Sequence, residues 1–190
     1  RTYGMACDGP VFLEVKRRFG DAQIKSRVQV PAESWRWAVE PGGLEKCRAW
    51  GLSPKKWKVL QDFSALVAGW NLEPVVCVRY DRVPLVGRVD PELRVTFDRG
   101  IRAFSCHDYL LHAEDADYQP ADFPLTFDAP DPMLVLEVKF DGQFPVWLRD
   151  LTTRFELRRA AFAKYCVSLR QVQDGSLRQR SDTRAARWEG

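Results

Sequence analysis

The sequence has no long hydrophobic run, little net charge and only two histidines. Because a membrane-spanning helix needs about 20 predominantly apolar residues, the first absence argues against a transmembrane segment. The formal net charge of +3 argues against wholesale nonspecific binding of nucleic acid, although basic residues can still be concentrated locally. With 190 residues, 45% hydrophobic and 29% charged, the chain resembles a soluble globular protein, and we expect a single domain with one substantial core.

Paired cysteines and zinc-like spacings are missing as well. The histidines, His107 and His112, have no spacing to cysteine that is typical of zinc, and turn or strand positions account for them. The odd number and wide spread of the cysteines predict reduced thiols in or near the core of a cytoplasmic protein: Cys7, Cys47, Cys77, Cys106 and Cys166. No signal peptide is visible, but the chain starts at Arg1, directly before a predicted strand, so we expect upstream sequence.

What the sequence does contain is a set of strands that each have one charged face. In residues 134–140, Glu137 and Lys139 point to one side, and the apolar residues between them point to the other. The pattern recurs at residues 12–18, 22–30, 76–81, 93–98 and 101–104. Any one strand fits an antiparallel sheet with one solvated side. Together they favour a barrel with a basic interior, which suits phosphates held by arginine and lysine and a carboxylate left for a divalent metal.

Helical periodicity separates and follows these strands. Short helices are predicted at 32–39 and 44–50, and a longer one at 55–69 that Ser53 and Pro54 open. The tryptophans of this region are expected to pack helices rather than stack bases: Trp35, Trp37, Trp50, Trp57 and Trp70. Later helices are predicted at 145–155 and 157–169, and a polar disordered tail at 171–190. The expected connections are a loop or bulge at 83–87, a hairpin turn at 99–100, and a loop at 112–132 with a short edge strand at 125–127.

Six motifs come in an order that resembles a known family. They are Phe12-Leu13-Glu14-Val15-Lys16, Val78-Arg79-Tyr80, Leu93-Arg94-Val95-Thr96-Phe97-Asp98, Leu136-Glu137-Val138-Lys139, Pro145-Val146-Trp147-Leu148 and Phe162-Ala163-Lys164-Tyr165. The chain resembles the polyphosphate polymerase domain of the vacuolar transporter chaperone (VTC) family, within the triphosphate tunnel metalloenzymes or CYTH-like superfamily. The resemblance implies an α+β fold with an antiparallel β-barrel, the triphosphate tunnel, and helices packed outside. It covers residues 1–169, and the family's first tunnel strands precede this chain.

The resemblance also implies a domain organisation and roles for individual residues. A tunnel domain at 1–170 would be N-terminally incomplete and carry a helical insertion at 32–70. Glu137 matches the metal-binding glutamate, which implies Mn2+ or Mg2+ as cofactor. The residues with implied catalytic roles are Lys16, Arg79, Arg94, Glu137 and Lys164. The implied phosphate-binding set is Arg1, Lys16, Lys25, Arg27, Arg79, Arg94, Lys139 and Lys164. The chain departs from the family at Ala163, where a serine is common.

The implied reaction moves the terminal phosphoryl group of ATP to the end of a polyphosphate chain. Basic side chains would hold the phosphates in line while Glu137 anchors the metal. Two alternatives stay open: a hydrolase of triphosphate or nucleoside triphosphate, and a non-catalytic polyphosphate-binding module, which is favoured if the protein truly lacks the family's first strands. The expected partners are ATP and polyphosphate or inorganic phosphate, with a membrane protein as a further candidate and no nucleic acid. The sequence leaves the oligomeric state open.

Overall fold

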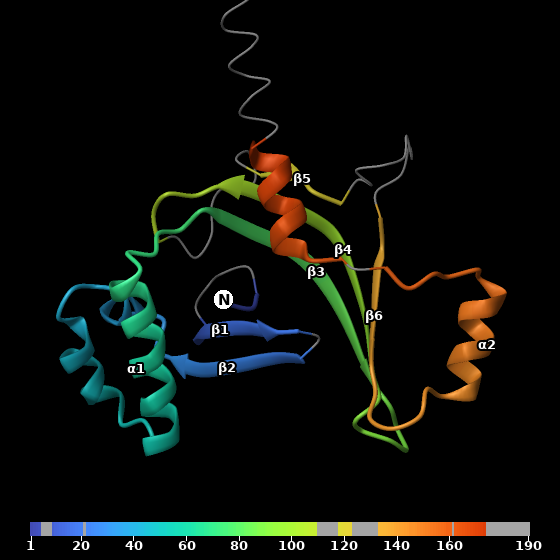
Figure 1. Ribbon diagram of the computed structural model, residues 1–190, viewed down its shortest axis with the longest axis horizontal. Coiled ribbons are helices and arrows are strands. Elements are labelled where there is room, and N and C mark those ends of the chain that lie inside the picture. The colour runs from blue at the N-terminus through green and yellow to red at the C-terminus, as the bar shows by residue number, and fades with distance from the viewer. Residues whose placement is uncertain (5–8, 21, 110–117, 123–132, 161, 174–190) are drawn as a thin grey trace, which may run out of the picture. The chain divides into compact units, whose positions relative to one another are not determined.

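The computed structural model describes residues 1–4, 9–20, 22–109, 118–122, 133–160 and 162–173 (Figure 1). The fold is α+β with antiparallel sheets. The chain divides into two compact units: unit 1 comprises Arg1–Pro74 and Cys106–Ala113, and unit 2 comprises Val75–Ser105 and Glu114–Gly190. Within the described ranges, strand pairing gives one two-stranded and one four-stranded sheet and no closed barrel. The tunnel therefore stays a prediction.

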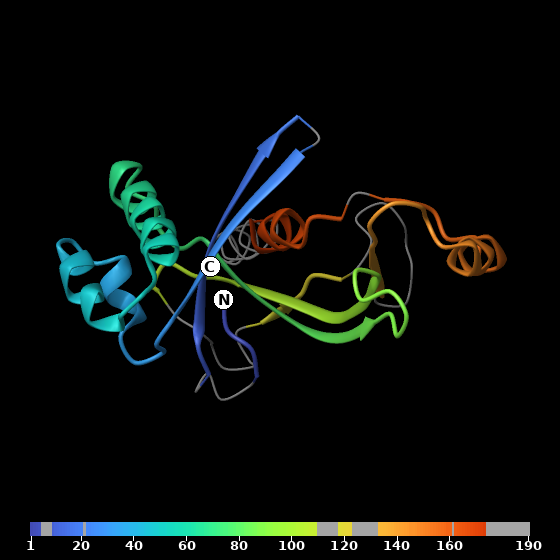
Figure 2. The same cartoon turned by 90° about the horizontal axis from the view of Figure 1, so that it is seen from below.

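Unit 1 is built on a β-hairpin. Strands β1 (Val11–Phe19) and β2 (Ala22–Val30) pair antiparallel from Val11 opposite Val30 to Phe19 opposite Ala22 (Figure 2). This register puts the buried residues Leu13 and Val28 on one face. The opposite face carries the charged side chains, as the alternation predicted. Both strands match their predicted ranges to within a residue at either end.

Three helical segments cover the apolar face of the hairpin. They are η1 (Trp35–Ala38), η2 (Gly43–Trp50) and α1 (Pro54–Gly69). The first two are 3-10 helices, and they confirm the short helices predicted at 32–39 and 44–50. Gly43 is buried, and a Cβ at this position would collide with the Trp37 carbonyl. Pro54 opens α1 as predicted, although the Ser53 side chain makes no capping bond.

Most of the tryptophans pack into this core. Trp35 is buried there, and the rings of Trp37 and Trp50 stack with centroids 6.0 Å apart. Trp70 is an exception, because 77% of its surface is exposed, so its predicted packing role is wrong. The described cysteines are free, as predicted, but Cys166 is exposed rather than near the core. Cys7 lies outside the described residues.

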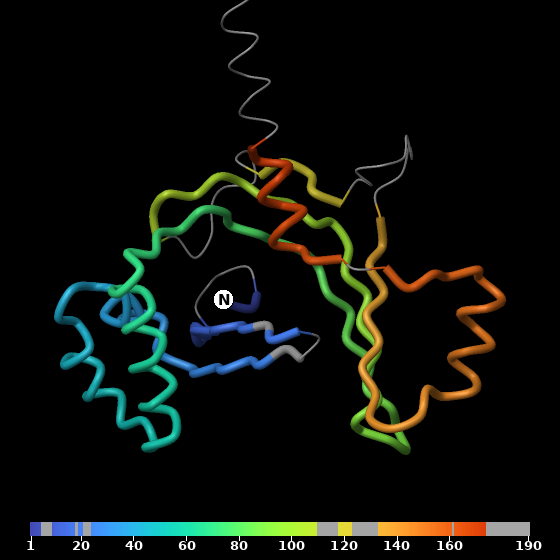
Figure 3. Tube along the Cα trace, in the orientation of Figure 1, coloured from blue at the N-terminus to red at the C-terminus, as the bar shows by residue number. Residues whose placement is uncertain are grey.

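Unit 2 is built on a long, bulged sheet. Strand β3 (Val76–Val86) pairs with β4 (Arg94–Ser105), and β5 (Gln119–Pro120) and β6 (Val135–Lys139) both pair with β4. The loop predicted at 83–87 is wrong, since β3 continues through Val86. The hairpin turn predicted at 99–100 is also wrong, because β4 is continuous through these two residues (Figure 3). Gly100 and Ile101 together face Tyr80, and the positive φ of 58° at Gly100 marks a β-bulge.

Two helices follow the sheet in the described part of unit 2. Helix α2 (Val146–Arg154) matches its prediction and ends where Glu156 adopts a positive φ of 51°. The helix predicted at 157–169 instead spans 164–173, because the linking residues pack in non-helical form: Leu157 lines a cavity and Phe162 contacts the Ile101 cluster. The expected tail therefore begins with three helical residues. The remainder of that tail and the edge strand predicted at 125–127 lie outside the described residues.

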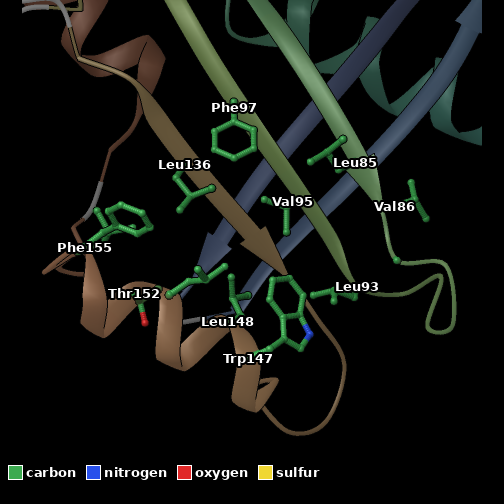
Figure 4. Close-up of a pocket in the computed structure, with 13 residues that line it drawn as sticks. Leu85, Val86, Leu93, Val95, Phe97, Leu136, Trp147, Leu148, Thr152 and Phe155 are labelled. Carbon is green, nitrogen blue, oxygen red and sulfur yellow. The ribbon is translucent and has the colours of Figure 1, made fainter.

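Helix α2 stands over an apolar cavity on one face of this sheet. The cavity has a volume of about 370 Å³ and lies between α2 and side chains of β3, β4 and β6 (Figure 4). Leu148 is the α2 residue that is buried, while Trp147 and Phe155 flank it and stay more than half exposed. Around the cavity this face is apolar, and the charged side chains of the same strand segments lie on the other side. No helix in the described parts of the chain combines the length and apolarity that crossing a bilayer requires.

Candidate functional site

Charged residues of three strands meet on one face of the unit 2 sheet. Residues directly opposite each other in neighbouring strands share a face. Arg82 of β3 lies opposite Asp98 of β4. Along β4 towards Arg94, this face continues as Thr96 opposite Glu137 of β6 and Arg94 opposite Lys139. We call this surface, completed by Lys164 of the helix at 164–173, the charged face.

Asp98 is the centre of the charged face. Its side chain is fully buried, and its Oδ1 accepts a hydrogen bond of 2.6 Å from Nε of Arg82. Its Oδ2 accepts one of 2.7 Å from Nη2 of Arg82 and lies 2.5 Å from Nζ of Lys164. Burial alone would raise the pKa of the Asp98 carboxyl, but the bonds from Arg82 and Lys164 hold that pKa below its ordinary value. Asp98 is therefore a buried anion shared by two cations.

Glu137 is the second carboxylate and is accessible. Its side chain is 36% exposed; Lys139 lies 3.0 Å from Oε1, and Arg82 lies 3.3 Å from Oε2. Partial burial would raise the pKa of Glu137, but the bond from Lys139 and the charges of Lys139, Arg82 and Lys164 lower it. The bond to Asp98 raises the pKa of Arg82, so this guanidinium is always charged.

An aromatic ring and a hydroxyl complete the charged face. The Tyr80 ring centroid lies 5.5 Å from Cζ of Arg82 and 5.2 Å from Nζ of Lys164, which fits cation–π contact with both. The Thr96 hydroxyl oxygen is buried and has no hydrogen-bond partner among the described residues. Since a buried polar atom without a partner costs free energy, this hydroxyl is suited to meeting a ligand or water.

The two other predicted site residues of unit 2, Arg94 and Arg79, lie on opposite faces of the sheet. Arg94 lies on the charged face, is 55% exposed and approaches Glu92 at 3.7 Å. Arg79 pairs with Arg102 on the opposite face, and its Cζ lies 5.9 Å from the Tyr118 ring centroid. The structure thus brings Glu137, Lys139 and Lys164 together, adds Arg94 on the same side, and separates Arg79 from them.

Unit 1 carries a second basic cluster around Glu14. Lys25 lies 3.0 Å from Oε1 of this glutamate, Arg27 lies 3.4 Å away and Arg1 lies 3.9 Å away. Burial opposes ionisation, but Lys25, Arg1 and Arg27 lower the pKa of Glu14. Lys16 is exposed and lies directly opposite Lys25. Because like charges in this position are destabilising, the pair is better suited to an anionic ligand than to folding.

Sequence reasoning missed Arg82, Asp98, Tyr80 and Glu14 as site residues. The sequence did contain a signal for the first three. Tyr80 and Arg82 are two residues apart in β3 and therefore share a face, and the same spacing puts Arg94, Thr96 and Asp98 on one face of β4. The hairpin turn predicted at 99–100 hid the continuity of β4, so the facing register of the two strands could not be read. The family resemblance implies a role for Arg79 and not for Arg82, although these two residues point to opposite faces.

The side chains that could coordinate the implied metal decide which kind of metal site the protein can form. Among the residues that the structure describes, no three His, Cys, Asp or Glu side chains are grouped to hold an ion. On the charged face, both carboxylates have cationic partners, but Asp98 is fully buried whereas the Glu137 side chain is 36% exposed, so Glu137 is the carboxylate that an ion can reach. Mg2+ is often bound by one or two carboxylates together with substrate phosphates. The residues therefore fit an ion that Glu137 shares with phosphate oxygens, and do not fit an all-protein cage.

Comparison with known proteins identifies the family. Comparison with curated proteins gives no match. A family model described as the VTC domain matches residues 1–173, a range that includes the charged face, the Glu14 cluster and every predicted site residue. The chain therefore belongs to the VTC domain family, which is associated with polyphosphate.

Proposed function

We propose that this chain is a metal-dependent phosphotransferase that moves the terminal phosphoryl group of ATP to a polyphosphate chain. The observation that carries the proposal is the charged face, where Arg82 and Lys139 contact the accessible Glu137 and Lys164 contacts the neighbouring Asp98. Arginine and lysine in such a group can neutralise several neighbouring phosphates. Membership of a family associated with polyphosphate polymerase catalysis supports the same substrate class.

Phosphoryl transfer requires positioning and charge neutralisation more than covalent participation by the protein. Lys139 and Lys164 have ammonium N–H groups beyond those that face their carboxylates, and Arg82 uses Nε and Nη2, but not Nη1, in its bonds to Asp98 and Glu137. These remaining donors bind the phosphate oxygens and orient donor and acceptor. A bound Mn2+ or Mg2+ would be held by Glu137 and would neutralise charge on the transferred group.

One observation favours a second candidate, a non-catalytic polyphosphate-binding module. Both carboxylates of the charged face are already neutralised by the protein's own cations, and their pKa values are lowered accordingly. A surface of this kind binds a polyanion without needing a metal. This candidate predicts tight binding of polyphosphate and no turnover of ATP.

Product analysis tests these proposals. The purified chain is incubated with ATP and Mn2+ or Mg2+, and the products are separated on a gel stained for polyphosphate. We expect a ladder that is lost in Glu137→Gln and kept in Glu45→Gln, a matched control on an exposed carboxylate of unit 1. Orthophosphate without a ladder would indicate a hydrolase, and polyphosphate binding without turnover would indicate a binding module. A chain that neither binds polyphosphate nor consumes ATP would contradict all three.

A further inference from the structure

We propose that Asp98 is a positioning residue for phosphate binding, which holds Arg82 and Lys164 at fixed places on the charged face. The inference rests on the proposed function of that face and concerns a residue that does not touch the ligand. Asp98 is fully buried, and both of its carboxylate oxygens are engaged by these two cations. It is therefore unsuited to binding a metal or accepting a proton from substrate, and its effect is exerted through its partners.

The bulge in β4 explains why a carboxylate is buried there. In a regular strand, Asp98 and Ile101 would point to opposite faces because they are three residues apart. The extra residue at Gly100 brings both to the same side, where Ile101 and Ala103 are also fully buried. Phe162 and Val172, from before and within the helix at 164–173, pack on this apolar cluster. Asp98 thus lies beside a low-polarity core, where ion pairs are stronger than at a water-exposed surface.

Asp98 links two separate parts of the chain. Arg82 comes from β3, whereas Lys164 is the first residue of the helix at 164–173 (Figure 1). A lysine side chain has about 2 kcal/mol of rotamer entropy, much of which is lost when it binds a ligand. Because Asp98 already holds Lys164 in place, this side chain loses its rotamer entropy when the protein folds and not when phosphate binds. The two cations are consequently presented to phosphate in one arrangement.

A simple charge argument predicts the opposite effect of removing Asp98. Deleting a negative charge beside two cations should strengthen the binding of a polyanion by electrostatics alone. The positioning role predicts weaker binding by Asp98→Asn, because Lys164 loses its anionic partner and Arg82 keeps at most one of its two bonds, to the amide oxygen. The sign of the change in affinity therefore separates the two accounts.

The test is calorimetric titration of the full chain with inorganic tripolyphosphate. We expect Asp98→Asn to raise the dissociation constant at least about tenfold, and Asp81→Asn, a matched control on the other face of β3, to leave it within about twofold. In a Lys164→Met background the effect of Asp98→Asn should shrink, since its partner is already gone. Unchanged or tighter binding by Asp98→Asn would overturn the positioning role alone. A wild-type chain that binds no tripolyphosphate would overturn the proposed function and this inference with it.

A measurement on the wild-type chain covers the case in which Asp98→Asn fails to fold. Amide hydrogen exchange of residues 164–173 is recorded with and without saturating tripolyphosphate. A helix already held by Asp98 should show the same protection in both states. A helix whose protection rises several-fold on binding would mean that the ligand itself fixes Lys164, and this would overturn the proposal.

Discussion

The two carboxylates of the charged face differ in one property, access to solvent. Asp98 has no exposed surface, whereas the Glu137 side chain is 36% exposed and its neighbour Lys139 is 65% exposed. An approaching ligand therefore meets Glu137 and Lys139 first. Substitution of Glu137 should act on turnover, while substitution of Asp98 should act on the geometry of the cations.

Arg82 bonds both carboxylates at once, and a lysine cannot reproduce this geometry. Its Nε and Nη2 engage Asp98, and Nη2 also reaches Glu137. We expect Arg82→Lys to weaken polyphosphate binding by about tenfold or more, although the charge is kept. Fluorescence anisotropy with labelled polyphosphate measures this effect. Arg149→Lys, on an exposed part of α2, serves as the control, and equal affinities of the two variants would contradict the role of Arg82.

The lowered pKa of Asp98 predicts how stability depends on pH. A carboxyl group whose pKa is lower in the folded than in the unfolded state stabilises the fold fully above its ordinary value, here 3.8, and loses this contribution as the pH falls through the lowered value. Urea denaturation of the wild type should therefore show a free energy of unfolding that falls as the pH is lowered below 3.8. Asp98→Asn should lose less over the same range than Asp81→Asn. Equal losses would show that the buried ion pairs do not contribute.

For individual residues, the sequence predicted which face of a strand is charged, but it did not predict which side chains pair with one another. The charged alternation predicted Glu137, Lys139, Lys25 and Arg27 on charged faces, and the register confirms those faces. Arg79 and Arg82 could not be distinguished, because they belong to one strand and only the pairing with β4 fixes which face carries Asp98. That pairing is a long-range property, which local alternation does not contain.

At the scale of secondary-structure elements, Gly100 makes the bulge in β4 possible. Its φ of 58° lies in the left-handed region, where a side chain costs about 1–2 kcal/mol. We expect Gly100→Ala to lower the free energy of unfolding by about this amount and to weaken tripolyphosphate binding through Asp98. The measurement is urea denaturation followed by titration of the folded variant.

Gly69→Ala provides the matched control. Gly69 ends α1, and a Cβ there would meet no atom within 4 Å, so alanine should be neutral or stabilising. If both substitutions had the same effect on stability and affinity, the bulge would have no special role.

The same glycine shows why some elements could be predicted and others could not. Residues 22–30 and 55–69 have clear strand or helix periods, and both elements formed there as expected. Arg99-Gly100 has the chemistry of a hairpin turn, yet the same left-handed glycine also makes a bulge inside a long strand. Pairing along the whole of β3 selected the bulge. The local sequence fits a hairpin turn and a bulge equally well, so the pairing between β3 and β4 determines which of the two forms.

For the whole molecule, charge is balanced overall and concentrated locally. The 29 basic and 26 acidic residues nearly cancel, so long-range attraction of a polyanion is weak. Binding should instead depend on direct contacts that release counterions. We expect the logarithm of the polyphosphate association constant to fall linearly with the logarithm of salt concentration, and the slope to shrink by about 0.7 in Lys139→Met. A wild-type slope near zero would contradict a polyanion site.

Family membership could be predicted from the order of short motifs, and the match over residues 1–173 confirms it. The arrangement of the sheets could not be predicted to the same extent. Strand alternation favoured one barrel, whereas the described strands pair as a hairpin in unit 1 and a bulged sheet in unit 2. Alternation identifies which face of a strand is charged, and it does not specify which strands become neighbours.

The tryptophans are distributed unevenly between the two units, so the spectroscopic signals of the units differ. Unit 1 contains five of the seven, and Trp35, Trp37 and Trp50 pack in its core, where fixed surroundings give indole rings a near-ultraviolet circular dichroism signal. Trp147 of unit 2 sits on α2 beside the apolar cavity (Figure 4). Loss of the near-ultraviolet signal on heating should therefore report mainly on unit 1. Comparing that curve with the far-ultraviolet signal of all elements shows whether the two units unfold in one transition or in two.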